Sequence, residues 1–328
     1  MIYAPNALEL TLDCDTDKFS KLQERAYEKA NRNHRFYSEA DSYVDCILAG
    51  NGMRIEYHES TYKKKVKLVV NPTLLLRGGD VKKLWEPDDD NVQKLLYKLE
   101  KYIEHYLGSK YKLNNFKLTR IHFAVNIDLG NRKLVTAYIK VMQNIGKVKG
   151  FAPKHSKEGS LGNLSFDLEG NSNGIEFTAY DKESGSGGKK ARGVLCAEVR
   201  LVKQKTIRKC TNKTITSKQL EDLALNSKEI FLTTFAHVVP FGDYYKKKDA
   251  MRIVEESGLK RKSKAKMLRL LELIPKKKSL LLAQKAMNER NIEKIMKMFE
   301  KIHLSPVTIS KRQDIKYLDT LYLHMLHK

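Results

Sequence analysis

The sequence predicts an α+β protein: an antiparallel-rich central sheet with helices on one face, followed by a helical C-terminal domain. Up to about residue 215, several segments alternate apolar and polar residues as half-buried strands do, and helical segments join some of them. Beyond that point the apolar residues recur at helical spacing. Pro240–Asp243 interrupts this pattern, so we divide the chain into residues 1–240 and residues 241–328.

The N-terminal segments are short and varied. Leu8–Leu12 predicts an apolar strand, and Asp17–Ala30 predicts a helix. The segments MRIEYHES and KVKLVVNP predict the two strands of a hairpin. NPTLLLRGGD follows and predicts a structured loop, because Pro72 and the pair Gly78–Gly79 break regular structure.

Helices and strands alternate in the middle of the chain. Asp88–Asp90 supply an N-cap and first-turn negative charge for a helix that ends at Gly108. FKLTRIHFAVNIDL shows the clearest alternation in the chain, and an amphipathic helix over residues 134–145 follows it. Three further strands are predicted in NLSFDLEG, GIEFTAYDKE and GVLCAEVRLV, with a flexible loop rich in glycine, serine and lysine between the last two.

The charge of the chain points to a polyanionic partner. The 62 lysines and arginines outnumber the 39 aspartates and glutamates, giving a formal net charge of +23 and a pI of about 9.6. Nucleic acid is the commonest partner of so basic a protein. The alternative is a ribosome-associated or merely basic soluble protein. Charge alone does not distinguish a DNA-cleaving protein from one that only binds.

Other features narrow the location. No apolar run reaches the 18 residues of a membrane-spanning helix, so we expect no membrane partner. MIYAPNALEL lacks the basic and apolar regions of a signal peptide. The four cysteines have neither the spacing of zinc ligands nor the density of a disulfide scaffold, which favours a reducing, cytoplasmic setting.

Three strands share a pattern that brings reactive groups together. TRIHFAVNID, IEFTAYDKE and CAEVRL each carry polar side chains on one parity and apolar side chains on the other. If these strands pair in one sheet, their polar side chains converge on its uncovered face. The converging residues would be Arg120, His122, Asn126, Glu176, Tyr180, Lys182, Glu198 and Arg200.

This mixture of side chains suits metal-assisted cleavage of a phosphodiester. A phenol with a pKa near 10 is a weak nucleophile at neutral pH, and we expect Lys182 and Arg200 to lower the pKa of Tyr180. A divalent ion, Mg²⁺ or Mn²⁺, bound by His122 and Glu198, with Asn126 as a third candidate, would polarise the phosphate. The alternative is an ordinary solvated sheet face with a structural tyrosine and histidine.

The succession LTRIHFAVNIDL, FTAYDKE and LCAEVRLVKQ resembles the rolling-circle replication initiators of the filamentous-phage gene II type and their Firmicute plasmid and phage relatives. Those proteins are related to relaxases and share an HUH-endonuclease-like fold. KLVVNPTLLLRGGD is similar to a segment of the Firmicute members. The resemblance covers about residues 50–215.

The resemblance implies a metal-dependent nickase that joins itself to DNA through a tyrosine. Tyr180 would be the nucleophile, Lys182 its basic neighbour and Glu198 a metal ligand. The family's paired metal histidines are absent because Ala124 follows His122 at the second position, which puts the metal set in doubt. His58, His105 and His155 are further candidate ligands, and Tyr37 and Tyr138 are candidates for a second tyrosine.

Two basic segments are candidate DNA contacts beside Arg120. Lys189, Lys190 and Arg192 follow the Tyr180 strand in a glycine-rich loop that suits phosphate binding. Residues 250–274 read as helix, turn at Gly258, helix, resembling a helix-turn-helix; a solvated helical bundle is the alternative. The basic side chains of its second half are Lys260, Arg261, Lys262, Lys264 and Lys266.

The sequence therefore predicts a rolling-circle replication initiator that nicks and religates origin DNA, single-stranded or supercoiled, with a host helicase as a further partner. The rival prediction is a non-catalytic, sequence-specific DNA-binding regulator, and a third is an RNA-binding protein. Tyr180 discriminates between them, because only a nickase needs its hydroxyl.

Overall fold

The computed structural model describes residues 1–30, 36–39, 42–45, 52–77, 83–154 and 165–326. Its strands are β1 (Tyr3–Cys14), β2 (Phe36–Glu39), β3 (Ser42–Asp45), β4 (Met53–Ser60), β5 (Lys63–Val70), β6 (Lys117–Asp128), β7 (Phe151–Pro153), β8 (Ser165–Gly170), β9 (Ile175–Asp181) and β10 (Val194–Leu201). They form one ten-stranded sheet in the order β2-β3-β4-β5-β1-β6-β10-β9-β8-β7, and neighbouring strands are antiparallel. The predicted α+β class with a large antiparallel sheet is confirmed.

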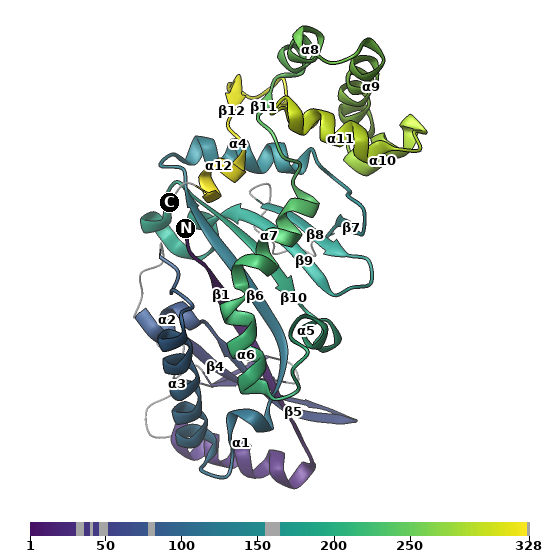
Figure 1. The fold of residues 1–328 in the computed structure, drawn as a ribbon. Coiled ribbons are helices and arrows are strands. Elements are labelled where there is room, and N and C mark those ends of the chain that lie inside the picture. The colour runs from purple at the N-terminus through teal and green to yellow at the C-terminus, as the bar shows by residue number, and fades with distance from the viewer. Residues whose placement is uncertain (31–35, 40–41, 46–51, 78–82, 155–164, 327–328) are drawn as a thin grey trace.

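Helices cover the apolar face of this sheet (Figure 1). They are α1 (Thr16–Ala30), α2 (Pro72–Arg77), α3 (Asp89–Leu107), α4 (Arg132–Gln143), α5 (Gln204–Thr211), α6 (Thr216–Leu225) and α7 (Ser227–Val238). Phe19 of α1 packs against Tyr57 of β4, and Phe235 of α7 packs against Phe177 of β9, with ring centroids 6.3 and 6.0 Å apart. These contacts bury the apolar parity of the strands and leave the polar parity on the other face.

Two β-bulges in the β1–β6 pairing adjust the alternation of the central strands. The register of β1 against β6 shifts between Pro5 and Ala7 and again between Glu9 and Leu10. The second shift explains why Leu118 and Ile121 differ in parity in the sequence but are both buried. Pro5 is tolerated in a central strand because it lies beside the first bulge.

The segment predicted as a structured loop after β5 is instead the helix α2, so that prediction is wrong. Asn71 caps the helix: its Oδ1 accepts a hydrogen bond from the backbone N–H of Leu74 at 3.1 Å. Pro72 is the first helical residue, where its missing N–H does no harm. The proline that suggested a break therefore starts the helix. Gly78 and Gly79 lie outside the described residues.

The loop between β9 and β10 is also more regular than predicted. Glu183–Gly187 forms a π-helical turn, η4, and Gly188–Ala191 forms a 3₁₀ turn, η5. The side chains of Lys189, Lys190 and Arg192 are exposed. The turns η4 and η5 therefore give regular backbone structure to a segment whose glycine content predicted a flexible loop.

The C-terminal part is helical, as predicted. It contains α8 (Lys247–Glu256), α9 (Arg261–Lys277), α10 (Leu280–Met287) and α11 (Ile292–Lys301), followed by α12 (Leu321–Leu326), and a small sheet joins β11 (Tyr244–Tyr245) to β12 (Tyr317–Leu318). Figure 1 shows α8–α11 as a cluster beyond one end of the sheet, whereas α12 returns to the first part of the chain. Tyr138 of α4 donates a hydrogen bond to the carbonyl of Asp319 at 2.9 Å. The boundary at residue 240 stays a prediction.

Within the described ranges, no helix is both long and apolar enough to cross a bilayer.

Candidate functional site

The three strands that carry the predicted reactive residues are adjacent, in the order β6-β10-β9, and their register aligns the polar side chains. Each residue of β10 from Leu195 to Leu201 lies between one partner on β9 and one on β6, and cross-strand partners share a face. Tyr180, Glu198, Arg200 and His122 therefore lie on one face of the sheet, and their roles stay a prediction. The rows across the three strands are Tyr180–Cys196–Asn126, Thr178–Glu198–Ala124 and Glu176–Arg200–His122.

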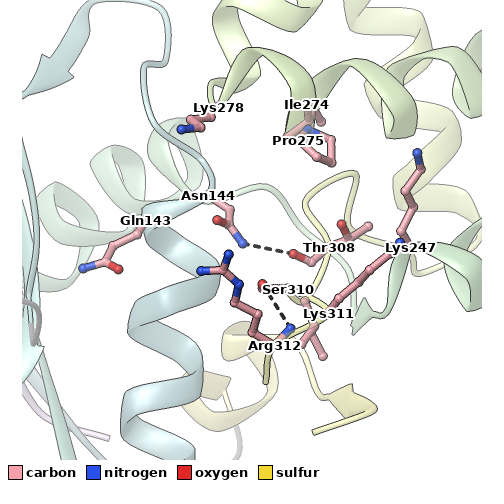
Figure 2. A pocket seen from close by; sticks show the side chains of 11 residues that line it. Gln143, Asn144, Lys247, Ile274, Pro275, Lys278, Thr308, Ser310, Lys311 and Arg312 are labelled. Atoms are coloured by element: carbon pink, nitrogen blue, oxygen red, sulfur yellow. Dashed lines mark hydrogen bonds between the residues drawn. The ribbon is translucent and has the colours of Figure 1, made fainter. Parts of the chain in front are cut away.

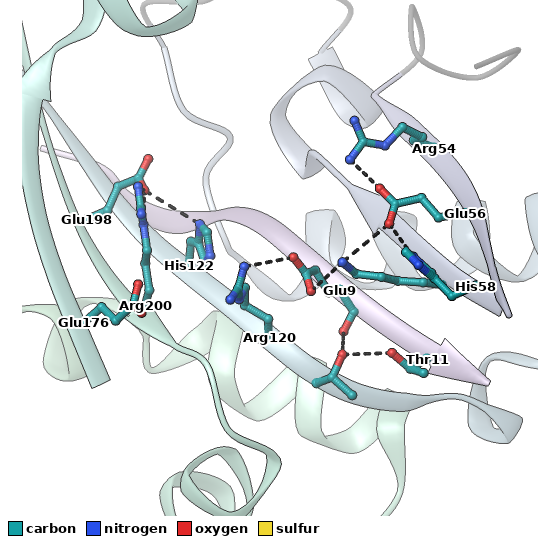
Figure 3. A network of polar contacts seen from close by, with 12 residues as sticks. Glu9, Thr11, Arg54, Glu56, His58, Arg120, His122, Glu176, Glu198 and Arg200 are labelled. Atoms are coloured by element: carbon teal, nitrogen blue, oxygen red, sulfur yellow. Dashed lines mark hydrogen bonds and ion pairs between the residues drawn. The ribbon is translucent and has the colours of Figure 1, made fainter. Parts of the chain in front are cut away.

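Glu198 lies at the centre of this arrangement, 3% exposed, and its two oxygens bind different partners. Oε1 accepts a hydrogen bond from the Tyr180 hydroxyl at 2.8 Å. Oε2 accepts a hydrogen bond from Arg200 Nε at 2.9 Å, and Arg200 Nη2 lies 2.8 Å from the same oxygen in an ion pair. The ring of His122 approaches Oε2 with Nδ1 at 3.7 Å (Figure 3). The carboxylate thus joins the phenol, the guanidinium and the imidazole.

Asn6 completes the site and was not found from the sequence. Its amide Nδ2 donates to Glu198 Oε1 at 3.3 Å, across 192 positions of the chain. Asn6 is the bulged residue of β1, between Pro5 and Ala7, and a bulge re-aims the side chain it carries. The dipeptide Pro5–Asn6 inside an apolar strand is a signal for a bulge, but only the strand order shows that it lies beside Glu198.

The expectation that Lys182 and Arg200 lower the pKa of Tyr180 is wrong. Burial, together with the neighbouring Cys196 and Glu198, raises the pKa of the phenol well above its ordinary value of 10.0. The guanidinium of Arg200 is paired with Glu198 instead. Burial also favours the protonated carboxyl of Glu198, but Arg200, His122 and the hydrogen bonds from Tyr180 and Arg200 together outweigh burial and hold that pKa below its ordinary value. At neutral pH the proton therefore resides on the phenol and the negative charge on Glu198.

His122 is a neutral imidazole in this setting. Burial lowers its pKa from 6.5 to about 4, against the opposing effect of Glu198. Its Nε2 atom is buried and has no hydrogen-bond partner among the described residues. A neutral imidazole with an available ring nitrogen is a metal-ligand type.

The lowered pKa of His122 predicts a loss of stability in mild acid. The unfolded chain takes up the imidazole proton near pH 6.5, whereas the folded protein takes it up only near pH 4. Stability should therefore fall as the pH is lowered across that window, by up to about 3 kcal/mol from this group. Urea unfolding with EDTA present should show the fall in the wild type and a flatter profile in His122→Gln. Parallel profiles would contradict the prediction.

The predicted metal set is only partly assembled. Within the ranges that the structure covers, no three histidine, cysteine, aspartate or glutamate side chains lie close enough together to hold a metal. His122 and Glu198 supply two donors, but both oxygens of Glu198 already accept hydrogen bonds. His122 and Glu198 alone therefore do not complete a metal site, and the metal stays a prediction.

The other predicted ligands and tyrosines lie elsewhere. His58 contacts Glu56 on β4, which two strands separate from β6, and His105 is exposed on α3. The buried Tyr138 hydroxyl is bound to Asp319 and His324. The residue His155 and the side chain of Tyr37 lie outside the described residues.

Lys182 and Asn126 keep their predicted places beside the site. Lys182 directly follows β9, is 6% exposed and lowers the pKa of the Cys196 thiol, although burial raises that pKa overall to about 12. Asn126 lies one strand from Cys196 in the row of Tyr180. Their predicted roles stay proposals.

The predicted DNA-contact residues form separate groups. Arg120 pairs with Glu9 at 3.2 Å, in a polar row that continues through Lys67 to Glu56 (Figure 3). The basic residues of α9 lie in the C-terminal cluster, apart from β9 and β10 (Figure 1). Lys260, Arg261 and Lys262 are exposed at its N-terminal end, whereas Lys264 donates to the carbonyl of Glu255 and Lys266 pairs with Glu289.

Gly193 shapes the end of the sheet next to the site. Its φ is +81°, and a Cβ there would lie 2.8 Å from the backbone nitrogen of Asn131. We expect Gly193→Ala to destabilise the fold by about 2–3 kcal/mol. Gly150→Ala is the matched control, because Gly150 has a φ of +80° but a Cβ at that position would meet no atom within 4 Å. It should lose only about 1 kcal/mol. Equal losses in urea unfolding would show that the close approach at Gly193 carries no energy.

No family model and no curated protein matches the chain. Among solved structures, it is similar to the rolling circle replication initiator protein from Geobacillus stearothermophilus. The two chains are 12% identical with a TM-score of 0.39, and the match covers 72% of this chain and 85% of the other. The candidate site is therefore supported by the strand register and the side-chain contacts of this chain.

Proposed function

We propose that the chain is a rolling-circle replication initiator, a DNA nickase and strand transferase whose nucleophile is Tyr180. One observation carries the proposal: the Tyr180 hydroxyl donates to the buried Glu198 carboxylate at 2.8 Å, and Arg200 and His122 adjoin the same carboxylate. The net charge of +23 and the resemblance of these three strands to the initiator family support it.

The reaction follows from these groups. The phenolic oxygen of Tyr180 attacks phosphorus, the bond from phosphorus to the 3′ oxygen breaks, and the leaving oxygen takes a proton to become a free 3′-hydroxyl. Glu198 Oε1 is placed to accept the phenolic proton. The product is a tyrosine phosphodiester, which keeps the bond energy, so that religation is the reverse attack by a 3′-hydroxyl.

The side chains of the candidate site differ in their exposure to solvent. The side chains of Arg200 and His122 are 26% and 16% exposed, whereas Tyr180 as a residue is 9% exposed. A phosphate that approaches from solvent would therefore meet the guanidinium before the phenol. In this proposal Arg200 binds the phosphate, which weakens its ion pair with Glu198. The Glu198 carboxylate then becomes more basic.

The proposal includes a requirement for Mg²⁺ or Mn²⁺, with His122 and Glu198 as two donors. The metal would supply Lewis-acid polarisation of the phosphate. Its substrate would be single-stranded or supercoiled origin DNA, and a host helicase would be a further partner.

The direct test uses the full-length protein, labelled single-stranded DNA and either metal ion. We expect an SDS-stable protein–DNA adduct that EDTA prevents. Salt-sensitive DNA binding without any adduct, across a library of sequences, would contradict the nickase.

Two observations also fit the alternative function, a non-catalytic DNA-binding regulator. The raised pKa of Tyr180 and the ion pair between Arg200 and Glu198 also suit a purely structural polar cluster. In a regulator, substitution of Tyr180 would alter stability alone.

A further inference from the structure

Basic side chains line a groove along the contact between α4 and the segment of residues 308–315 in the C-terminal part. It consists of two cavities, of about 880 and 480 Å³, that share Arg312 as a wall. Figure 2 shows Arg312 directed towards Asn144 at the end of α4, with Lys278 and Lys247 on opposite sides of the smaller cavity. We call the two cavities together the interdomain groove. Its walls include Arg132, Lys133, Lys140, Arg192, Lys311 and Arg312.

Arg132 is paired with Asp181 and Glu183, but most of the other basic side chains of the interdomain groove have no ion-pair partner among the described residues. Lys133, Lys140 and Arg312 form no ion pair with any residue in the described part of the chain, and the same holds for Arg192 and Lys311. Asp314 is the one carboxylate among the described lining residues. Like charges gathered on both walls of a cleft repel one another and attract a polyanion.

The interdomain groove begins where the strands of the candidate site end. Asp128 of β6 pairs with Val194 of β10, and the chain continues on both sides into the lining residues 130–133 and 192. Arg132 of the interdomain groove contacts Asp181, the residue after Tyr180, with its Nε at 3.0 Å. Asp181 and Tyr180 face opposite sides of the sheet, so a strand that leaves the groove would pass round the ends of β6 and β10 to reach Tyr180. Arg192 precedes Val194, the first residue of β10, by two positions, and Cys196 of the same strand is the cross-strand neighbour of Tyr180.

The size and lining of the interdomain groove select the form of the polyanion. Cavities of about 880 and 480 Å³ have the size of small-molecule sites, which suits a short stretch of a flexible single strand better than a duplex. The described lining residues include no aromatic side chain on which a base could stack. Lysine and arginine would therefore contact phosphates, and binding would be insensitive to base sequence.

We propose that the interdomain groove binds the phosphate backbone of single-stranded DNA and guides that strand to Tyr180. The guiding role rests on the proposed function, whereas the binding role does not. The groove would hold several phosphates of one strand on the side of the site where β6 and β10 end.

Fluorescence anisotropy with a labelled oligothymidine tests this assignment. The full-length chain would carry Tyr180→Phe in EDTA, so that binding is measured without cleavage. Adding Lys133→Gln, Lys140→Gln, Lys311→Gln and Arg312→Gln should weaken binding on the order of 100-fold near 0.15 M salt. The negative slope of the logarithm of the association constant against the logarithm of the salt concentration should become smaller in magnitude by up to about 3. Each lost phosphate contact on a single strand removes about 0.7.

The matched control removes four exposed lysines from α1, α3 and the loop after α3, with the same change in net charge. It carries Lys21→Gln, Lys94→Gln, Lys101→Gln and Lys110→Gln, and its affinity should stay close to that of the parent. Equal losses in the two quadruple variants would overturn the interdomain groove as a site. Tighter, groove-dependent binding of a duplex or of an RNA of the same length would overturn the single-stranded DNA assignment. If the groove variant alone loses binding but no adduct forms in the wild type, the groove stands and the nickase fails.

Discussion

Tyr180→Phe should abolish the SDS-stable DNA adduct while leaving DNA binding intact. The substitution removes one oxygen, which is both the nucleophile of the proposed reaction and the donor to Glu198 at 2.8 Å. Loss of a hydrogen bond to a charged group should also lower the free energy of unfolding by about 2 kcal/mol. The measurements are adduct formation on a denaturing gel, anisotropy with the same oligonucleotide, and urea unfolding.

Tyr138→Phe is the matched control. Tyr138 is also a buried tyrosine, and its hydroxyl donates to the carbonyl of Asp319 at 2.9 Å, but it belongs to α4 and not to the candidate site. This variant should lose about 1 kcal/mol of stability and retain the adduct. If Tyr180→Phe forms as much adduct as the wild type, Tyr180 is not the nucleophile, whatever its effect on stability.

Glu198→Ala should have the largest effect on stability. The carboxylate is almost fully buried and balances the charge of Arg200, whose guanidinium is itself mostly buried. Removing one partner of such a pair leaves an uncompensated charge, which costs about 3–5 kcal/mol, and we expect about 3 because Arg200 reaches solvent in part. The midpoint of urea unfolding should fall without a change in its m-value.

A double-mutant cycle separates the lost charge balance from lost packing. Arg200→Leu in the Glu198→Leu background should recover part of the stability, because it removes the unbalanced charge, whereas the Tyr180 hydroxyl still lacks its acceptor. Glu198→Leu and Arg200→Leu effects that simply add would show that the two side chains are not coupled. The cycle needs no DNA and is therefore independent of the proposed function.

Much of the fold was determined locally, which is why the sequence predicted it. The N-cap Asp88, which accepts from the backbone N–H of Asn91 at 2.7 Å, and the alternation of β6, β9 and β10 are properties of short segments. The shared parity of Tyr180, Glu198 and His122 follows from the same alternation once the strands are adjacent. The local pattern gave a wrong prediction at Pro72, because proline can break a helix or, as here, begin one.

The tertiary structure decided the chemistry of the site. The order β1-β6-β10-β9 and a bulge brought Asn6 to Glu198, and no local pattern encodes a pairing across 192 residues. Burial, which the sequence does not state, raised the pKa of Tyr180 where neighbouring positive residues had suggested a lower one. The interdomain groove likewise exists only because residues 308–315 return to α4. Side-chain periodicity determines which face of the sheet a residue occupies, whereas strand order and burial determine its contacts and its protonation state.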